Sequence, residues 1–368
     1  MFIFNCSHEM ALAANRSNYT PPQRIRQMEH DLQLFPLVWL NNEEDESCIV
    51  WGWDLAVRER LRKAGVSMSL MPTDAELALW RSFSHRAFAA GYLHDFLEKE
   101  PLLKADQWVG REMRFVRSVS DITFPSAVPI IVKQPFSSSG RGNRVGTSDN
   151  PHFIDLVEDW IAANDGVLLD RFYDKVLDFA TEFEVKSDGQ VLFLGYSVFD
   201  ANPQGRYGGN IVDSQTALKT RILAAIPRFD LDACVRCHHQ MLSQTFAHRY
   251  RGYVGIDMMV VRDEGGKRKV HPCVEMNLRM NMGIVAIRLY DKLRLLQHLV
   301  SQGATRADCL QNKKLGFLMM VPEADFSRFH FDDLYHLLRS SSRLPLSPIR
   351  DCGFQAFLQS GRLAISFS

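Results

Sequence analysis

The fold of this chain is decided by the stretch Val274-Glu275-Met276-Asn277-Leu278-Arg279. Apolar and polar residues alternate here, which predicts a β-strand with one apolar face and one polar face. Glu275 and Asn277 are two positions apart, so their side-chain oxygens point to the same face of that strand. Arg279 continues the alternation, and we expect its side chain to face the same site.

A second carboxylate is expected on the neighbouring strand. Residues 255–261 and 270–276 predict a hairpin, because a turn-forming segment separates them. Asp257 lies inside the first apolar strand, where an unpaired carboxylate is costly. With Glu275 and Asn277 it makes an all-oxygen cluster of the kind that Mg²⁺ prefers. The alternative is an edge strand with solvated polar residues, which leaves the second carboxylate unexplained.

A cationic loop is predicted earlier in the chain. A strand over residues 128–132 ends at Lys133, and a loop of small residues follows: Ser137-Ser138-Ser139-Gly140-Arg141-Gly142. The lysine offers a fixed cation for phosphate oxygens, and the backbone N–H groups of such a loop can close over them. Taken alone, the pattern favours a solvated hairpin turn. It matches neither a P-loop nor a dinucleotide-binding fingerprint.

The remaining elements are predicted from apolar periodicity and from turn and cap residues. Before residue 100, strands are predicted at 1–4, 36–40, 48–53 and 66–71, and helices at 23–34, 54–63 and 72–97. This alternation favours an open, largely parallel sheet covered by helices. Later strands are predicted at 167–172, 179–186 and 191–198, and later helices at 150–163, 232–249 and 291–302.

The composition is that of a soluble globular protein. The 368 residues include 43 Lys and Arg and 43 Asp and Glu, so the formal net charge is zero. This balance argues against a generic nucleic-acid partner, which needs a surplus of cations. No apolar run is long enough to cross a bilayer, and the first residues do not resemble a signal peptide. The seven scattered cysteines therefore predict free thiols in a cytoplasmic protein with no membrane partner.

One cysteine motif allows a second interpretation. The run Cys234-Val235-Arg236-Cys237-His238 has the spacing of a haem-attachment motif. Cys234, Cys237 and Met241 also fall on one stripe of the predicted helix, the spacing of buried residues. We therefore interpret the motif as core packing.

The order of these segments resembles the ATP-grasp superfamily over about residues 100–300. The resemblance implies a fold class of α/β and α+β: an open N-terminal α/β domain that precedes a two-lobed ATP-grasp fold. The implied domains are 1–98, then 99–303 with a small lobe over 99–172 and a large lobe over 173–303. Residues 304–368 form a C-terminal α+β appendage in this scheme.

The resemblance also implies roles in nucleotide binding. Lys133 is similar to the lysine that contacts the α- and β-phosphates of ATP, and residues 137–142 resemble the loop over the β- and γ-phosphates. The hinge that reads the adenine edge is matched by Leu169, Asp170, Arg171 and Phe172. Glu182 is similar to the acid that holds the ribose hydroxyls, with Asp178 as its rival.

The magnesium ligands of the superfamily are matched by Asp257, Glu275 and Asn277, with Mn²⁺ as an alternative metal. Arg279 resembles the arginine that steadies the transferring phosphoryl group, so Arg279 and Lys133 are the implied catalytic residues. Candidates for contact with the acceptor are Asn5, His8, Glu9 and Asn210. The alternative for the first three is a turn and helix cap.

The implied activity is that of an ATP-dependent carbon–nitrogen ligase. Such an enzyme activates a carboxylate as an acyl phosphate and transfers it to an amine or similar nucleophile, from small-molecule or peptide substrates. One alternative is an ATP-grasp phosphotransferase without ligation, and another is a non-catalytic nucleotide-binding regulatory protein. Lys133 and the acidic cluster argue against the last. The sequence leaves the oligomeric state open, with a homo-oligomer as one option.

Overall fold

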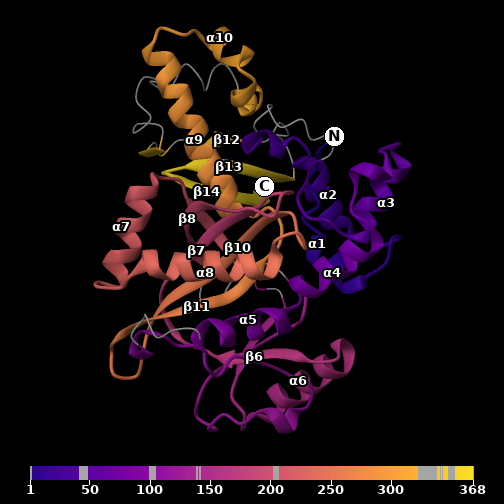
Figure 1. The fold of residues 1–368 in the computed structure, drawn as a ribbon, viewed down its shortest axis with the longest axis vertical. Coiled ribbons are helices and arrows are strands. Elements are labelled where there is room, and N and C mark those ends of the chain that lie inside the picture. The colour runs from indigo at the N-terminus through magenta and orange to yellow at the C-terminus, as the bar shows by residue number, and fades with distance from the viewer. Residues whose placement is uncertain are drawn as a thin grey trace.

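The part of the chain that the structure describes forms three sheets with helices packed around them (Figure 1). The computed structural model describes residues 2–40, 49–98, 105–137, 140, 142–201, 207–321, 338–339, 341, 343–346 and 353–367. Each sheet belongs to a different part of the chain. The small parallel sheet is N-terminal, the four-stranded sheet follows it, and the eight-stranded sheet contains the remaining strands.

The N-terminal part is mostly helical. Its two short strands, β1 (Phe2–Ile3) and β2 (Ile49–Val50), pair in parallel. Its helices are α1 (His8–Ala14), α2 (Gln23–Asp31), α3 (Leu55–Lys63), α4 (Asp74–Ser84) and α5 (Arg86–Glu98), with 3₁₀ turns η1 (Phe35–Val38) and η2 (Met68–Leu70). Helix α3 begins where the sequence predicts, because the side chain of Asp54 accepts a hydrogen bond from the N–H of Val57.

Two predicted strands of this part are wrong. The segments 36–40 and 66–71 contain 3₁₀ turns, so the parallel sheet has two strands within the described residues. Pro36 explains the first error, since it cannot donate to a strand ladder and its fixed φ suits the start of a helical turn. In the second, the hydroxyl of Ser67 caps the turn by accepting from the N–H of Ser69.

The four-stranded sheet forms a small lobe. Its strands are β3 (Arg114–Val116), β4 (Ile130–Lys133), β5 (Asn143–Gly146) and β6 (Val167–Arg171), in the antiparallel order β3-β6-β4-β5. The turns η3 (Ala105–Gln107) and η4 (Val119–Asp121) and helix α6 (Pro151–Asn164) complete it. Phe153 and Val157 of α6 pack with Val132 and Leu169 of the sheet. This lobe lies at the lower end of the molecule in Figure 1.

The eight-stranded sheet forms the large lobe. In spatial order it comprises β11 (Arg268–Asn277), β10 (Gly252–Arg262), β7 (Asp174–Val185), β8 (Val191–Ala201), β9 (Tyr207–Ile211), β14 (Arg362–Phe367), β13 (Phe354–Gln359) and β12 (Leu344–Pro345). Its helices are α7 (Gln215–Ala225), α8 (Leu231–Phe246), α9 (Met282–Ser301) and α10 (Arg306–Gln311), with the turn η5 (Lys313–Met320). Both predicted hairpins, β7–β8 and β10–β11, are confirmed.

The described C-terminal strands lie in the sheet of the large lobe. Strand β14 pairs with β9, with Leu363 opposite Asn210, so the last strands extend the sheet of the large lobe. Helix α9 also begins nine residues earlier than the predicted start at 291, because the side chain of Asn281 caps it by accepting from the N–H groups of Gly283 and Ile284. The domain boundaries themselves stay a prediction.

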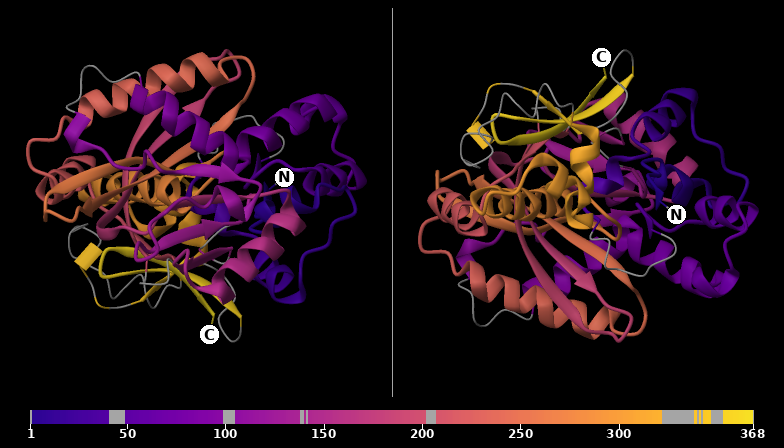
Figure 2. Two further views of the ribbon diagram at one scale, coloured as in Figure 1. Left: turned by 90° about the horizontal axis from the view of Figure 1, so that it is seen from below. Right: turned by 90° about the horizontal axis from the view of Figure 1, so that it is seen from above.

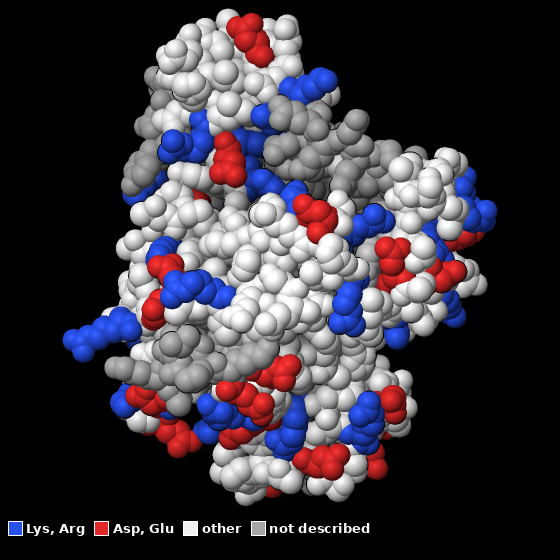
Figure 3. Space-filling model, viewed as in Figure 1, with Lys and Arg blue, Asp and Glu red and all other residues white. Residues whose placement is uncertain are grey.

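Figure 2 shows α8 and α9 on the large sheet, with α1 and α3 to one side of it; α5 packs against β11. Positive and negative side chains are interspersed over the face in Figure 3, in keeping with the balanced composition. No described helix is both long enough and apolar enough to span a bilayer. None of the five described cysteines is in a disulfide, which agrees with the prediction of free thiols.

Candidate active site

Strand pairing brings the predicted acidic cluster together. Asp257 of β10 lies directly opposite Glu275 of β11, and Gly255 lies opposite Asn277. Residues that are opposite one another in a sheet share a face, so these three polar side chains point the same way. The amide of Asn277 donates to Oδ2 of Asp257 at 3.1 Å.

Lys133 reaches this cluster from the small lobe. It is the last residue of β4, it is only 4% exposed, and its Nζ donates to the carbonyl oxygen of Val274 at 3.4 Å. Burial and the nearby charge of Arg86 lower the pKa of Lys133, while the carboxylates of Glu275, Asp170 and Asp257 oppose that shift. The cation therefore lies within charge–charge range of the acidic cluster.

The electrostatics of the cluster suit a divalent cation. Burial raises the pKa of Asp257 well above its usual value, and the neighbouring carboxylates of Glu275 and Glu182 raise it further. A bound cation would offset this cost. Within the described residues no three His, Cys, Asp or Glu side chains form a metal-binding group, so the predicted set is two carboxylates and one amide. A small ligand set of this kind suits Mg²⁺, which keeps waters and phosphate oxygens as further ligands.

Arg86 is a site residue that the sequence analysis missed. It begins α5, and its guanidinium donates to Glu275 at 2.8 Å and to the hydroxyl of Ser137 at 2.6 Å. It also donates to the carbonyl oxygens of Gln134 and Ser137. It is only 4% exposed. One arginine thus ties the start of the small-residue loop to a predicted metal ligand. A lone arginine in a helical segment carries no local signal of this role.

Half of the predicted phosphate loop lies within the described residues. Ser137, Gly140 and Gly142 are described, whereas Ser138, Ser139 and Arg141 lie outside the described residues. Gly140 has φ +71°, a conformation that favours glycine. A Cβ atom on Gly142 would come within 2.5 Å of the Ser137 side chain. Both glycines are therefore required by the close path of this loop.

The predicted adenine hinge covers the last three residues of β6 and Phe172 after it. Leu169 is fully buried, and Asp170 is bonded to Nε2 of His271 in β11 at 3.0 Å. The N–H of Arg171 donates to the Asp170 side chain, and the N–H of Phe172 donates to the carbonyl oxygen of Pro129. Both of these amides are thus engaged within the chain, and the adenine-reading role stays a prediction.

Glu182 is less suited to a ribose contact than the sequence suggests. It is 1% exposed, and its two carboxylate oxygens accept from Ser197 at 2.9 Å and from Asn281 at 2.8 Å. Asp178, the other candidate, comes four residues before Glu182 on β7, so the two side chains share a face of the strand. Burial raises the pKa of Asp178, and the charge of Lys133 opposes that shift. Burial of Glu182 therefore argues for Asp178 in that role.

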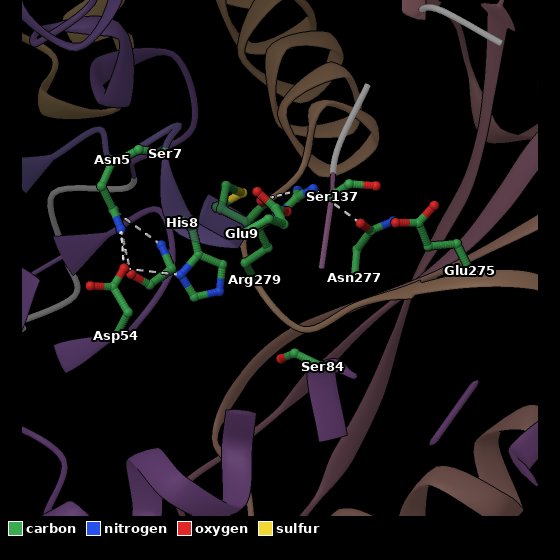
Figure 4. Close-up of polar contacts among 12 residues, drawn as sticks. Asn5, Ser7, His8, Glu9, Asp54, Ser84, Ser137, Glu275, Asn277 and Arg279 are labelled. Atoms are coloured by element: carbon green, nitrogen blue, oxygen red, sulfur yellow. Dashed lines mark hydrogen bonds and ion pairs between the residues drawn. The ribbon is translucent and has the colours of Figure 1, made fainter. Parts of the chain in front are cut away.

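A pocket opens beside the cluster. Its walls include Glu275, Asn277 and Arg279 on one side and His8 and Glu9 of α1 on the other. Arg279 forms an ion pair with Glu9 and donates to Oδ1 of Asn277 at 3.1 Å (Figure 4). The N-terminal part of the chain therefore completes a pocket whose other walls come from the two lobes.

Two acceptor candidates lie outside this pocket lining. Asn5 is buried and donates to the carbonyl oxygen of Gly52 at 2.7 Å and to Asp54, so its side chain joins β1 to the segment after β2. Asn210 is on β9, four strands from β11, and it accepts from the hydroxyl of Tyr207. The structure therefore does not bring Asn5 or Asn210 to the acidic cluster.

The cysteine motif is part of the core, as the helical stripe indicates. Cys234 and Met241 are buried with His238 in α8, and all three face the large hydrophobic core. His238 stacks against Phe96. The described residues contain no metal-binding group here.

The chain was compared with known families, sequences and structures. No protein-family model matches the chain, and no curated protein matches it. Solved structures resemble it weakly. N5-carboxyaminoimidazole synthetase from Staphylococcus aureus with ADP is 11% identical at a TM-score of 0.36, over 56% of this chain and only 52% of that one.

Biotin carboxylase from Campylobacter jejuni is 13% identical at a TM-score of 0.41, over 79% of this chain and 70% of that one. D-alanine–D-alanine ligase from Helicobacter pylori is 15% identical at 0.34, over 61% and 60%. Structural similarity this weak supports no conclusion about activity. Any function must therefore be argued from the geometry of this chain. In this chain a small antiparallel sheet and a larger sheet form two lobes, and the polar cluster lies where Lys133 of the first meets β10 and β11 of the second.

Proposed function

We propose that this protein is an ATP-dependent ligase that binds Mg-ATP between its two lobes. It activates a carboxylate as an acyl phosphate and transfers the acyl group to an amine, forming a carbon–nitrogen bond. Its substrates are a small-molecule or peptide carboxylate and an amine.

One observation carries the proposal. Side chains from three separated segments meet in one cluster: Lys133 at the end of β4, Asp257 in β10, and Glu275 with Asn277 in β11. Glu275 and Asn277 also line the pocket, so opposite charges lie beside it. A surface ion-pair network would explain exposed charges, but Lys133 is 4% exposed and Asp257 lies in the sheet with its pKa raised by burial.

The residues of the pocket act mainly through position and charge. Asp257, Glu275 and Asn277 would hold Mg²⁺, which neutralises charge on the phosphate oxygens when it is bound. Lys133 and Arg279 supply fixed positive charge to the transferring phosphoryl group, and the N–H groups of the loop after β4 add donors. Arg86 keeps that loop next to Glu275. An acyl phosphate is easily hydrolysed, so the pocket must also exclude water.

ADP release by the purified protein tests this proposal. The reaction contains Mg-ATP with mixtures of amino acids, peptides and small carboxylic acids, each alone and combined with amines. A ligase releases ADP only when a carboxylate and an amine are both present. Release with a single substrate and a stable phosphorylated product indicates a phosphotransferase. Calorimetry that detects no binding of Mg-ATP would reject both enzymes.

The metal assignment is tested by Glu275→Ala. We expect Mg-dependent turnover to fall on the order of 10²-fold or more, as in single-donor deletions at other charged sites. Glu59→Ala is the matched control, because Glu59 is a carboxylate of α3 that pairs with Arg62 and lies outside the pocket lining. Full activity in Glu275→Ala would refute the metal site.

A further inference from the structure

The proposed ligase reaction raises a chemical requirement that the phosphate-binding residues do not meet. An amine at neutral pH carries a proton, and an ammonium group has no lone pair with which to attack an acyl phosphate. A base must therefore stand beside the acceptor. Lys133, Arg86 and Arg279 are cations, and Asp257 and Glu275 are assigned to the metal, so none of these groups is suited to the task.

His8 of α1 is one of the residues that line the pocket. It is only 3% exposed, and its Nδ1 is 3.2 Å from Oδ2 of Asp54. That contact fixes Nδ1 as the protonated nitrogen when the ring is neutral, and Nε2 on the opposite edge of the ring is then the acceptor (Figure 4). An imidazole oriented by a carboxylate is a common arrangement for a general base.

The position of the ring is fixed on a second side. A Cβ atom on Gly52 would come within 2.6 to 2.7 Å of three ring atoms of His8, so the ring lies flat against the glycine backbone. Asp54 is itself held, because it accepts from the N–H of Val57 and from the amide of Asn5. The ring is therefore held on two sides, and His8 lines the pocket.

Glu9 provides a neighbouring site for an ammonium group. It follows His8 in α1 and lines the same pocket. Burial alone would raise the pKa of Glu9, but the charges of Arg279 and His8 outweigh it and lower the pKa, so the carboxylate stays ionised. An ammonium that binds this carboxylate would lie beside the adjacent imidazole.

We propose that the acceptor substrate is an ammonium compound that binds at Glu9 and gives its proton to Nε2 of His8, with Asp54 as the residue that positions the ring. This proposal rests on the ligase function above. The ammonium loses its first proton to His8, and its lone pair forms the C–N bond with the acyl carbon. The C–O bond to phosphate then breaks, and the phosphate oxygen keeps the electron pair. The second proton on nitrogen leaves with the phosphate as hydrogenphosphate.

The decisive experiment separates acyl-phosphate formation from amine transfer. Hydroxylamine is already unprotonated at neutral pH, so it traps acyl phosphates as hydroxamates without a base. Wild-type protein and His8→Asn are given Mg-ATP and the twenty amino acids, with or without hydroxylamine. Asparagine keeps a donor to Asp54 but lacks Nε2. We expect hydroxamate formation to change less than about threefold and amide formation to fall about 10²-fold or more.

His30→Asn is the matched control, since His30 also lies next to an aspartate but on α2, with an exposed side chain and no part in the pocket lining. It should leave both reactions unchanged. Asp54→Asn keeps an oxygen for the cap of α3 and should lower the kcat of amide formation with little change in the KM for ATP. Equal loss of hydroxamate and amide in His8→Asn, or no loss of amide, would overturn the proposal.

A wild-type protein that forms neither product contradicts the proposed function and leaves the role of His8 to a second measurement. Diethyl pyrocarbonate acylates accessible, unprotonated imidazole nitrogens, and mass spectrometry locates the adduct. We expect an adduct on His8 and none on His238 or His271, which are fully buried. An unmodified His8 would show that Nε2 cannot meet a solute in the pocket, and this result also overturns the proposal.

Discussion

Glu182 is a carboxylic acid in a place where a carboxylate is costly. Burial raises its pKa to about 7, although hydrogen bonds from Asn281 and Ser197 favour the ionised form and limit the shift. Its neighbours leave no space, since a Cβ atom on Gly283 would come within 2.1 Å of its Oε1 and one on Gly255 within 2.7 Å of its Oε2. The residue therefore joins β7 to the start of α9 and titrates near neutral pH.

This pKa predicts a pH dependence of stability. The folded protein holds the proton of Glu182 up to about pH 7, whereas the unfolded chain loses it near 4.5. The contribution to stability is therefore fully present below pH 4.5 and is lost as the pH rises to 7. Its size is about 3 kcal/mol, from about 1.4 kcal/mol for each pKa unit.

Glu182→Gln removes this titration and keeps side-chain hydrogen bonding with Ser197 and Asn281. We expect the difference in unfolding free energy between variant and wild type to shift in favour of the variant between pH 4.5 and 7. Urea denaturation at several pH values measures it. Glu264→Gln, at an exposed turn, is the control. A difference that is constant across this pH range would contradict the assignment.

At the level of the elements, the break between α4 and α5 determines where Arg86 lies. His85 is extended, with φ −74° and ψ 135°, so α5 starts a new helix whose first residue points to the loop after β4. Arg86 there bonds to Gln134, Ser137 and Glu275 at once. This geometry uses the planar fork of a guanidinium, which a lysine does not have.

Arg86→Lys should therefore impair the loop although it keeps the charge. We expect a rise in the KM for ATP of about 10-fold or more and a loss of about 2 kcal/mol in stability, the scale of one or two lost charged hydrogen bonds. Steady-state kinetics and chemical denaturation measure the two effects. Arg58→Lys is the matched control, since Arg58 bonds to Pro72 and to an exposed Asp74 outside the pocket lining. Wild-type kinetics in Arg86→Lys would show that the contacts of Arg86 with the loop and Glu275 are not needed for activity.

The two mistaken strands at 36–40 and 66–71 show a limit of reading short apolar runs. A run of five or six apolar residues is too short to show a repeat in hydrophobicity, so it does not distinguish a strand from a buried turn. Phe35, Pro36 and Val38 are buried because this segment packs beside α9, where Nζ of Lys292 donates to the carbonyl oxygens of Leu37 and Leu40. That packing partner lies about 250 residues away, so local sequence gives no signal of it.

At the level of the whole molecule, the C-terminal strands β14, β13 and β12 form one side of the large sheet. Leu358 and Ala356 of β13 and Leu363 of β14 are buried in one hydrophobic core with Ile284 and Leu289 of α9. Asp31 of α2 accepts from the N–H of Phe354, so the N-terminal part is bonded to the same strands. The C-terminal strands therefore belong to the structure that supports the pocket.

Removing residues 304–368 should prevent folding instead of leaving an intact nucleotide-binding unit. We expect the truncated chain to show no cooperative thermal transition and no stabilisation by Mg-ATP. Leu358→Ala is a milder variant that should cost about 2–5 kcal/mol, whereas the exposed Gln359→Ala should change stability by about 0.5 kcal/mol or less. A soluble truncated protein that binds Mg-ATP like the full chain would show that residues 304–368 are not needed for folding or nucleotide binding.

The sequence predicted the acidic cluster because its geometry is local. Asp257, Glu275 and Asn277 lie on one hairpin, and the two-residue period of strands determines which side chains share a face. The role of Lys133 was predicted from its place at the end of a strand. The role of Arg86 and the pairing of β14 with β9 were not predicted, because both depend on contacts between distant segments. The burial of Glu182 was missed for the same reason, since its partner Asn281 comes 99 residues later.

The ion pair between Arg279 and Glu9 has a consequence for selectivity. An anionic substrate that reaches Arg279 must displace the Glu9 carboxylate from the guanidinium. Its net gain in binding free energy is then only the difference between its own attraction to Arg279 and that of Glu9. A simple anion such as acetate therefore binds weakly. A zwitterion that offers a carboxylate to the arginine and an ammonium to the glutamate replaces both halves of the pair at once. We therefore expect the Arg279–Glu9 contact to favour binding of compounds that carry both charges.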